Sequence, residues 1–123
     1  MKTLTLILRL LLGLVFTIFG LNGFFHFIPN MPMPAAAGAF LGALAATGYV
    51  LPLMFAAQVI GGLLLLIGFA VPFALTVLAP VVINIFFFHA NLAPGGLPIA
   101  IVVCLIELFL AWSYRSAFAS LFA

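Results

Sequence analysis

The sequence contains very little charge. Of its 123 residues, three are Lys or Arg, one is Asp or Glu, and 69% are hydrophobic. A soluble domain carries about 25% charged residues. The small number of charged side chains here therefore excludes a water-soluble globule. Most of the surface must instead face lipid. The three cations are also too few to form the basic face that nucleic-acid binding requires, so no nucleic-acid partner is expected.

Cysteine is almost absent as well, since Cys104 is the only one. A thiol–disulfide exchanger needs two thiols, which this chain alone does not provide. The paired Cys and His spacings of zinc sites are also missing. We therefore predict no catalytic residues, no metal site and no bound cofactor from motifs, and the sequence favours a protein that is not an enzyme.

Long apolar runs dominate the chain. A transmembrane helix needs about 20 mostly apolar residues, and the runs that satisfy this are 4–27, 50–71, 73–89 and 98–114. They predict an all-α fold, a four-helix transmembrane bundle that forms a single membrane domain over residues 1–123. Pro80 lies inside the third run and predicts a kink there.

The segments between these runs carry the helix-breaking residues. Prolines in 28–34 end the first span, and Pro72 marks the turn between the second and third. Residues 35–47 are too short to span, so they predict a short interfacial helix, or one tucked against the bundle, after the first span. A continuation into the second span is the alternative. Residues 91–96 are expected to form a plain loop.

The positions of the cations predict the orientation. With four spans both termini lie on one side, and Lys2, Arg9 and Arg115 all lie near that side. The loops of the opposite side carry no Lys or Arg. The positive-inside rule therefore predicts a multi-pass protein of the plasma (inner) membrane with both termini cytoplasmic.

Polar residues inside the spans are the candidate functional residues, because each needs a partner in lipid. Glu107 is the single carboxylate, and its depth is close to that of Arg9. We expect an ion pair between them across the first and fourth spans. The alternatives are hydrogen bonds to Glu107 from Gln58 and Asn84, or a neutral Glu107. A structural pair and a proton-titrating or ligand-binding carboxylate both remain open.

Two further polar pairs lie toward the predicted outer edge. Asn22 and His26 are four residues apart and share a helix face, whereas Asn84 and His89 share one only loosely. Each histidine is predicted to lie at the membrane interface and to form hydrogen bonds with loop carbonyls. Ligation of haem or a metal by both histidines, and contact with a quinone, are the alternatives.

Several stretches together resemble the DoxX-like family of small integral membrane proteins. They cover nearly the whole chain, namely 9–16, 20–24, 56–68, 78–89, 107–108 and 114–115. The resemblance implies a four-helix membrane fold. The family is named after a subunit of a thiosulfate–quinone oxidoreductase, and other members are linked to redox-stress systems. Relatives often carry a carboxylate where this chain has Gln58, so a role that needs two carboxylates is in doubt here.

These observations predict an accessory subunit, or a binder of a partner or a quinone-like ligand, in a redox-related membrane complex. The expected partners are membrane lipid and other membrane or redox subunits, and an oligomer remains open. One alternative is a small proton-coupled transporter that uses Glu107. The other is a redox enzyme that binds haem or quinone through His26 and His89.

Overall fold

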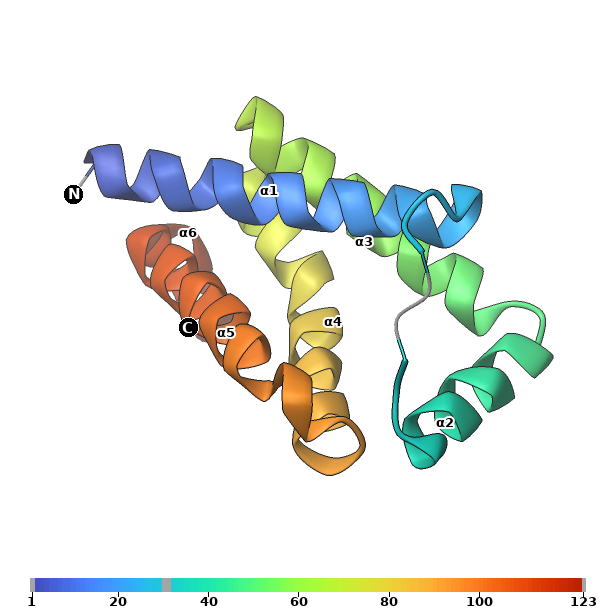
Figure 1. Cartoon of the computed structure of the whole chain (residues 1–123). Coiled ribbons are helices and arrows are strands. Elements are labelled where there is room, and N and C mark those ends of the chain that lie inside the picture. The colour runs from blue at the N-terminus through green and yellow to red at the C-terminus, as the bar shows by residue number, and fades with distance from the viewer. Residues whose placement is uncertain (1, 30–31, 123) are drawn as a thin grey trace.

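The computed structural model describes residues 2–29 and 32–122, and within these it is helical without strands (Figure 1). Four helices of this described part are long: α1 (Lys2–Phe25), α3 (Val50–Ile67), α4 (Val71–Asn91) and α5 (Leu97–Ser113). A shorter helix, α2 (Ala35–Ala46), lies between α1 and α3 in the sequence. A 3₁₀ turn, η1 (Pro94–Gly96), precedes α5. The tail forms α6 (Arg115–Phe118) and η2 (Ala119–Phe122).

The predicted four-helix fold is confirmed. In the described part of the chain, four helices are long and apolar enough to cross a membrane: α1, α3, α4 and α5 with its preceding turn. The protein is therefore an integral, multi-pass membrane protein. The boundaries differ slightly from those expected, since α1 ends at Phe25 and α4 extends to Asn91. Asn30 and Met31, in the proline-rich segment, lie outside the described residues.

Glycines bring α1 and α3 into close contact. A Cβ atom added at Gly62 would lie 2.5 Å from Thr17 Oγ1 and 2.9 Å from the carbonyl oxygen of Gly13. Gly20 of α1 likewise faces the backbone of α3 at Phe55. Since lipid tails are as apolar as the helices, such close packing is what holds transmembrane helices together. Gly62 is therefore a position where the backbones of the two helices approach closely.

Helix α4 lies between α3 and α5 and completes the core. Gly61 on α3 faces Leu78, and the fully buried side chains Leu65, Leu75 and Leu110 join α3, α4 and α5. Helix α1 contacts α5 as well, and near one end of the bundle Thr5 Oγ1 and Ser113 Oγ lie 3.3 Å apart. The other end of the bundle holds α2 and the turn η1 (Figure 1).

Two connections differ from the prediction. The turn between α3 and α4 is made by Gly68 and Ala70, which both have positive φ (73° and 52°), and Pro72 lies in the first turn of α4. Proline is favoured there because the first amides of a helix have no intrahelical partner. Residues 91–96 are not a plain loop, because α4 includes Asn91 and η1 follows.

The short helix after the first span is confirmed, and it is separate from α3. It contacts the bundle: the rings of Phe40 and Phe88 have centroids 5.9 Å apart, and Ala37 is completely buried. Thr47 closes α2, since its hydroxyl donates to the carbonyl of Leu44 and accepts from the amide of Val50. Helix α2 is thus tucked against the predicted outer end of the bundle.

Candidate functional site

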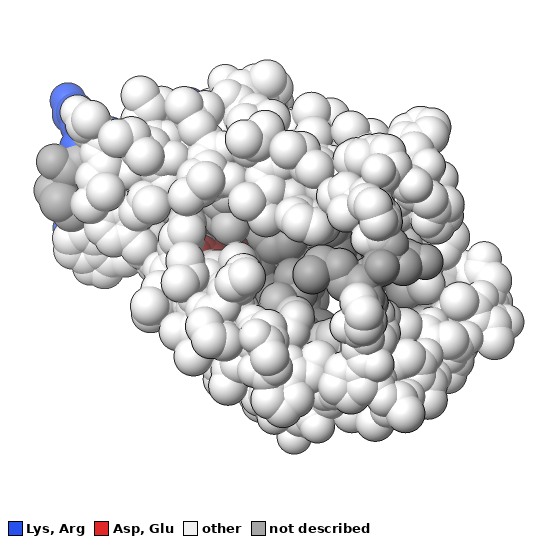
Figure 2. Space-filling model, viewed as in Figure 1, with Lys and Arg blue, Asp and Glu red and all other residues white. Residues whose placement is uncertain are grey.

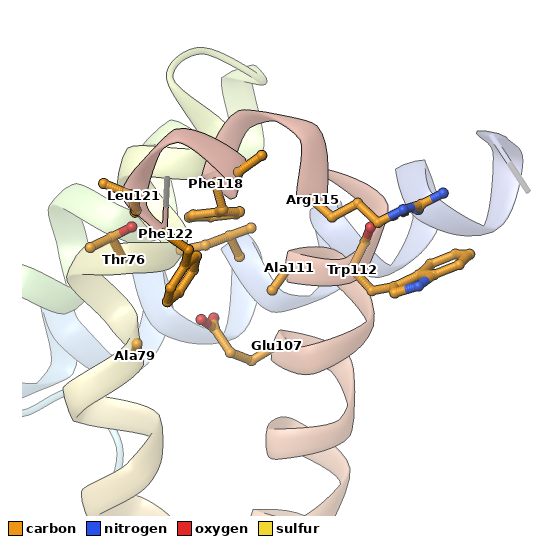
Figure 3. A pocket seen from close by; sticks show the side chains of 11 residues that line it. Thr76, Ala79, Glu107, Ala111, Trp112, Arg115, Phe118, Leu121 and Phe122 are labelled. Carbon is orange, nitrogen blue, oxygen red and sulfur yellow. Dashed lines mark hydrogen bonds between the residues drawn. The ribbon is translucent and has the colours of Figure 1, made fainter.

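A groove of about 570 Å³ lies between α4, α5 and the tail. Its walls are almost entirely apolar, and Glu107 is the one acidic residue in them. We call it the acid groove; it is lined by Glu107 and, among others, by Leu75, Ala79, Ala111, Phe118 and Phe122. In Figure 3 the carboxyl group of Glu107 points from α5 into the space beneath Phe122. The groove therefore places one carboxyl group in a largely apolar setting.

Glu107 is buried without a hydrogen-bond partner at one oxygen. The residue is 8% exposed, and its Oε1 atom is buried with no hydrogen-bond partner. An unpartnered buried polar atom costs roughly 1–3 kcal/mol, and more when it is charged. A native protein retains such a group where something outside the protein chain satisfies it or where the group has a function.

The tail forms the roof of this groove. Tyr114 ends α5, and the chain turns at once into α6, held by a hydrogen bond from the amide of Ala117 to the carbonyl of Tyr114. Phe118 and Phe122, four residues apart, both line the groove. Sequence inspection missed this arrangement. The available signal was the apolar i, i+4 spacing of these two phenylalanines directly after Arg115.

The predicted ion pair between Arg9 and Glu107 is wrong. Neither Glu107 Oε1 nor Arg9 Nε has a hydrogen-bond partner, although both atoms are buried. The guanidinium group of Arg9 lies against Gly68, where an added Cβ atom would be 2.7 Å from one of its nitrogens. Gly68 caps the C-terminal end of α3, and this end of a helix dipole is negative and attracts cations. Arg9 therefore lies beside a helix terminus rather than a carboxylate.

Arg9 belongs to a second groove of about 450 Å³, between α1 and the end of α5. We call it the basic groove. All three cations of the chain line it, together with three hydroxyl residues: Lys2, Arg9, Arg115, Thr5, Ser113 and Tyr114. Figure 2 shows a face that is almost uncharged, with a small red recess for the acid and blue atoms at the N-terminal end. Lys2 and Arg9 are thus separated from Glu107, whereas Arg115 lines both grooves.

The two amide candidates do not satisfy Glu107 Oε1. Asn84 is exposed, and its Nδ2 donates to the carbonyl of Pro80 on its own helix, over 3.3 Å. Gln58 is only 6% exposed and lies on α3, and it lines neither groove. The expected cluster of Glu107, Gln58 and Asn84 is therefore not assembled.

Asn22 and His26 together end α1. The amide of Ile28 donates to Asn22 Oδ1 over 2.7 Å, and the amide of His26 donates to the carbonyl of Asn22 over 2.7 Å. His26 has a φ of 53°, the left-handed conformation that ends many helices, and its side chain is exposed. These residues have a structural role at the end of the helix.

His89 is held within its own segment. Its Nδ1 atom lies 2.8 Å from the carbonyl oxygen of Ile85, and its ring packs on Gly96, where an added Cβ atom would clash with it. The sequence predicted a bond to a loop carbonyl, whereas this acceptor lies on α4 itself, one turn before His89. Among the described residues, no group of three or more His, Cys, Asp or Glu side chains could hold a metal ion.

Comparison with known proteins gives one family. Residues 4–91 match the model of the family described as DoxX. That range includes α1 to α4, so α5, Glu107 and the tail lie beyond it. No curated protein and no solved structure matches the chain.

Proposed function

Since the chain belongs to the DoxX family of membrane proteins, we propose that it is an accessory membrane subunit that binds a quinone-like ligand in the acid groove. One observation carries the proposal. Glu107 Oε1 is buried without a partner in the wall of an apolar groove of about 570 Å³. Ligand pockets typically measure about 300–1,000 Å³ and combine apolar walls with a few polar groups.

The chemistry of a quinone suits such a site. Its ring and tail are apolar, and each end of the ring carries one oxygen. An ionised Glu107 accepts a hydrogen bond from the hydroxyl of a quinol, and a protonated one donates to the carbonyl of a quinone. Phe118 and Phe122 place aromatic rings at the roof, where a flat ring can pack against them. The groove thus provides one oriented hydrogen bond and apolar contact.

The residues around Glu107 favour binding over catalysis. The described part of the groove contains no second acid, no histidine and no cysteine among its lining residues. The proposed role is therefore to hold or deliver the ligand for another subunit of a redox-related membrane complex. The DoxX match supports membership of the family, and the groove supports the type of ligand.

Fluorescence of the single tryptophan tests this proposal. Trp112 lines the groove, so ubiquinone-1 bound there should quench its emission in detergent-solubilised protein. We expect saturable quenching that weakens about fivefold in Glu107→Leu, because a protonated Glu107 donates to a quinone carbonyl and the loss of such a neutral hydrogen bond costs roughly 1 kcal/mol. His89→Gln lies outside the groove and is the matched control, with unchanged quenching expected.

Equal affinity in Glu107→Leu and the unaltered protein would contradict the proposal. Loss of affinity in His89→Gln instead would favour the alternative in which histidines contact the quinone. An absorption spectrum of the purified protein with a Soret band would favour the haem alternative.

A small proton-coupled transporter is the second candidate, and the unpartnered Oε1 of Glu107 favours it as well. In such a transporter the carboxyl group exchanges a proton for a substrate within the groove. The two functions differ in one measurement. Substrate uptake driven by a proton gradient, in vesicles, should be abolished in Glu107→Gln for a transporter and absent from both proteins for an accessory subunit.

We also propose that the protein lies in the plasma (inner) membrane with both termini cytoplasmic. The three cations gather in one groove at the end of the bundle that carries both termini, which agrees with the positive-inside rule. An impermeant maleimide tests this in a Cys104→Ser background. Ser120→Cys should react only in inverted vesicles and Thr47→Cys only in right-side-out ones. The reverse pattern excludes this orientation.

A further inference from the structure

The basic groove lies apart from the proposed quinone site, and its composition is unusual for this chain. It brings together Lys2, Arg9 and Arg115, which are all the basic residues of the sequence, and its lining contains no acid. Like charges that gather without a counter-charge repel one another, so the arrangement needs an anion or a negative dipole nearby. Only part of that need is met by the protein itself.

The partners of the arginines are known. Arg115 donates to the carbonyl of Trp112 over 3.0 Å and stacks 4.2 Å from the centre of its ring. In Figure 3 its guanidinium group points away from Glu107 and the acid groove. Arg9 lies at the C-terminal end of α3, yet its Nε is buried with no hydrogen-bond partner. Arg9 therefore still has one nitrogen without a hydrogen-bond partner, and Lys2, Arg9 and Arg115 all line the groove.

We infer that the basic groove binds the headgroup of an anionic phospholipid. Basic pockets between transmembrane helices on the cytoplasmic side are suited to such headgroups. A guanidinium group matches two phosphate oxygens, and the hydroxyls of Thr5 and Ser113 add donors beside it. The groove lies where α1 begins and α5 ends, at the level of a headgroup in the proposed orientation.

An apolar path for the acyl chain leads away from this groove. Leu6 lines the groove, and Leu10 and Leu14 follow at intervals of four residues, so the three share one face of α1. All three side chains are exposed, as a lipid-facing ridge must be. The groove and the ridge together therefore fit the two parts of one phospholipid molecule, whereas free phosphate would use only the groove.

The test compares two lipids with the same phosphodiester. Detergent-solubilised protein is mixed with equal amounts of phosphatidylglycerol and phosphatidylcholine, and bound lipid is counted by native mass spectrometry. Phosphatidylglycerol should predominate, because the choline cation of the other lipid is repelled by the groove. Lys2→Gln and Arg115→Gln should each reduce its affinity about fivefold, the change that corresponds to about 1 kcal/mol per basic side chain near an anionic surface.

A variant with unchanged net charge distinguishes specific lipid binding in the groove from general attraction of an anionic lipid to a positively charged protein. Arg115→Gln combined with Asn91→Lys keeps the net charge but moves one cation to the opposite end of the bundle. It should lose the preference as Arg115→Gln does, and Arg115→Lys should retain most of it. Both altered residues are exposed, and helix content measured by circular dichroism checks that each variant folds.

Two outcomes overturn the inference. One is an unchanged preference in the charge-matched variant, which would mean that the groove has no specific role. The other is displacement of phosphatidylglycerol by inorganic phosphate but not by chloride at equal ionic strength, which would assign the groove to a free anion. Quinone quenching of Trp112 should persist in Lys2→Gln, so this inference and the proposed function can fail separately.

Discussion

The acid groove and the basic groove lie at the same end of the bundle and share Trp112 and Arg115, yet they have opposite chemistry. The first is apolar with one carboxyl group, and the second holds every cation of the chain. Paired charges are the usual expectation inside a membrane. Here Arg115 has an aromatic partner, and Arg9 and Glu107 each have a buried atom without a hydrogen-bond partner.

The separation has identifiable causes. The ring and carbonyl of Trp112 hold Arg115, and the end of α3 lies beside Arg9, so neither cation depends on Glu107. An aromatic face and a helix C-terminus both attract cations without adding a formal charge. Under the proposed function, Glu107 then binds the ligand, and under the further inference the cations bind an anionic headgroup. The two proposals thus assign separate ligands to the two grooves at one end of the bundle.

The largest expected effect comes from Gly62→Ala, which disturbs the packing of α1 on α3. The new Cβ atom would approach Thr17 Oγ1 and the backbone of Gly13, and overpacking of this kind costs about 1–3 kcal/mol. Helix α1 forms a wall of the basic groove but lines no part of the acid groove. The preference for phosphatidylglycerol should therefore fall, while quenching of Trp112 by quinone changes little. Unfolding in detergent measures the stability.

Gly38→Ala is the matched control, because no atom lies within 4 Å of an added Cβ there. It lies in α2, where alanine is the better helix former by roughly 0.5–1 kcal/mol, so stability should rise slightly. Equal behaviour of the two variants would mean that α1 and α3 are not packed closely.

A smaller effect is expected at Gly68, which has a φ of 73° and adjoins the guanidinium group of Arg9. Alanine in this left-handed conformation costs about 1–2 kcal/mol, and the added Cβ atom displaces Arg9. Gly48→Ala has the same backbone penalty, with a φ of 80°, but open space around it. Only Gly68→Ala should therefore weaken the preference for phosphatidylglycerol.

If Gly48→Ala weakens that preference equally, the loss comes from the backbone and not from Arg9. If neither variant changes it, Arg9 takes no part in the basic groove, and the site would depend on Lys2 and Arg115 alone.

Much of the fold could be predicted from the sequence, because apolar length and proline position act locally. The four spans and the short helix after the first span are confirmed. The turn at Gly68 was assigned to Pro72 instead. A proline shows that a helix has begun or ended nearby, but it does not show which residue reverses the chain.

The site was harder to predict, because the depth of a residue in the membrane does not determine which neighbouring helix its side chain faces. Arg9 and Glu107 have similar depth, but α1 packs mainly on α3, and Glu107 faces α4 and the tail. The tail after α5 forms the roof of the acid groove, and no structure was predicted for it. Tertiary contacts of that kind leave only a weak pattern in a single sequence.

The smallest expected effect concerns the contact between the hydroxyls of Thr5 and Ser113, which joins α1 to α5 beside the basic groove. Hydrogen bonds between transmembrane helices contribute on average about 0.6 kcal/mol, so a double-mutant cycle with Thr5→Val and Ser113→Ala should give coupling of that size. Both residues line the basic groove and neither lines the acid groove. The double variant should therefore bind phosphatidylglycerol slightly less well and ubiquinone-1 equally well. A coupling of zero would remove this link between the helices, and a matching loss of quinone affinity would show that the two grooves act as one site.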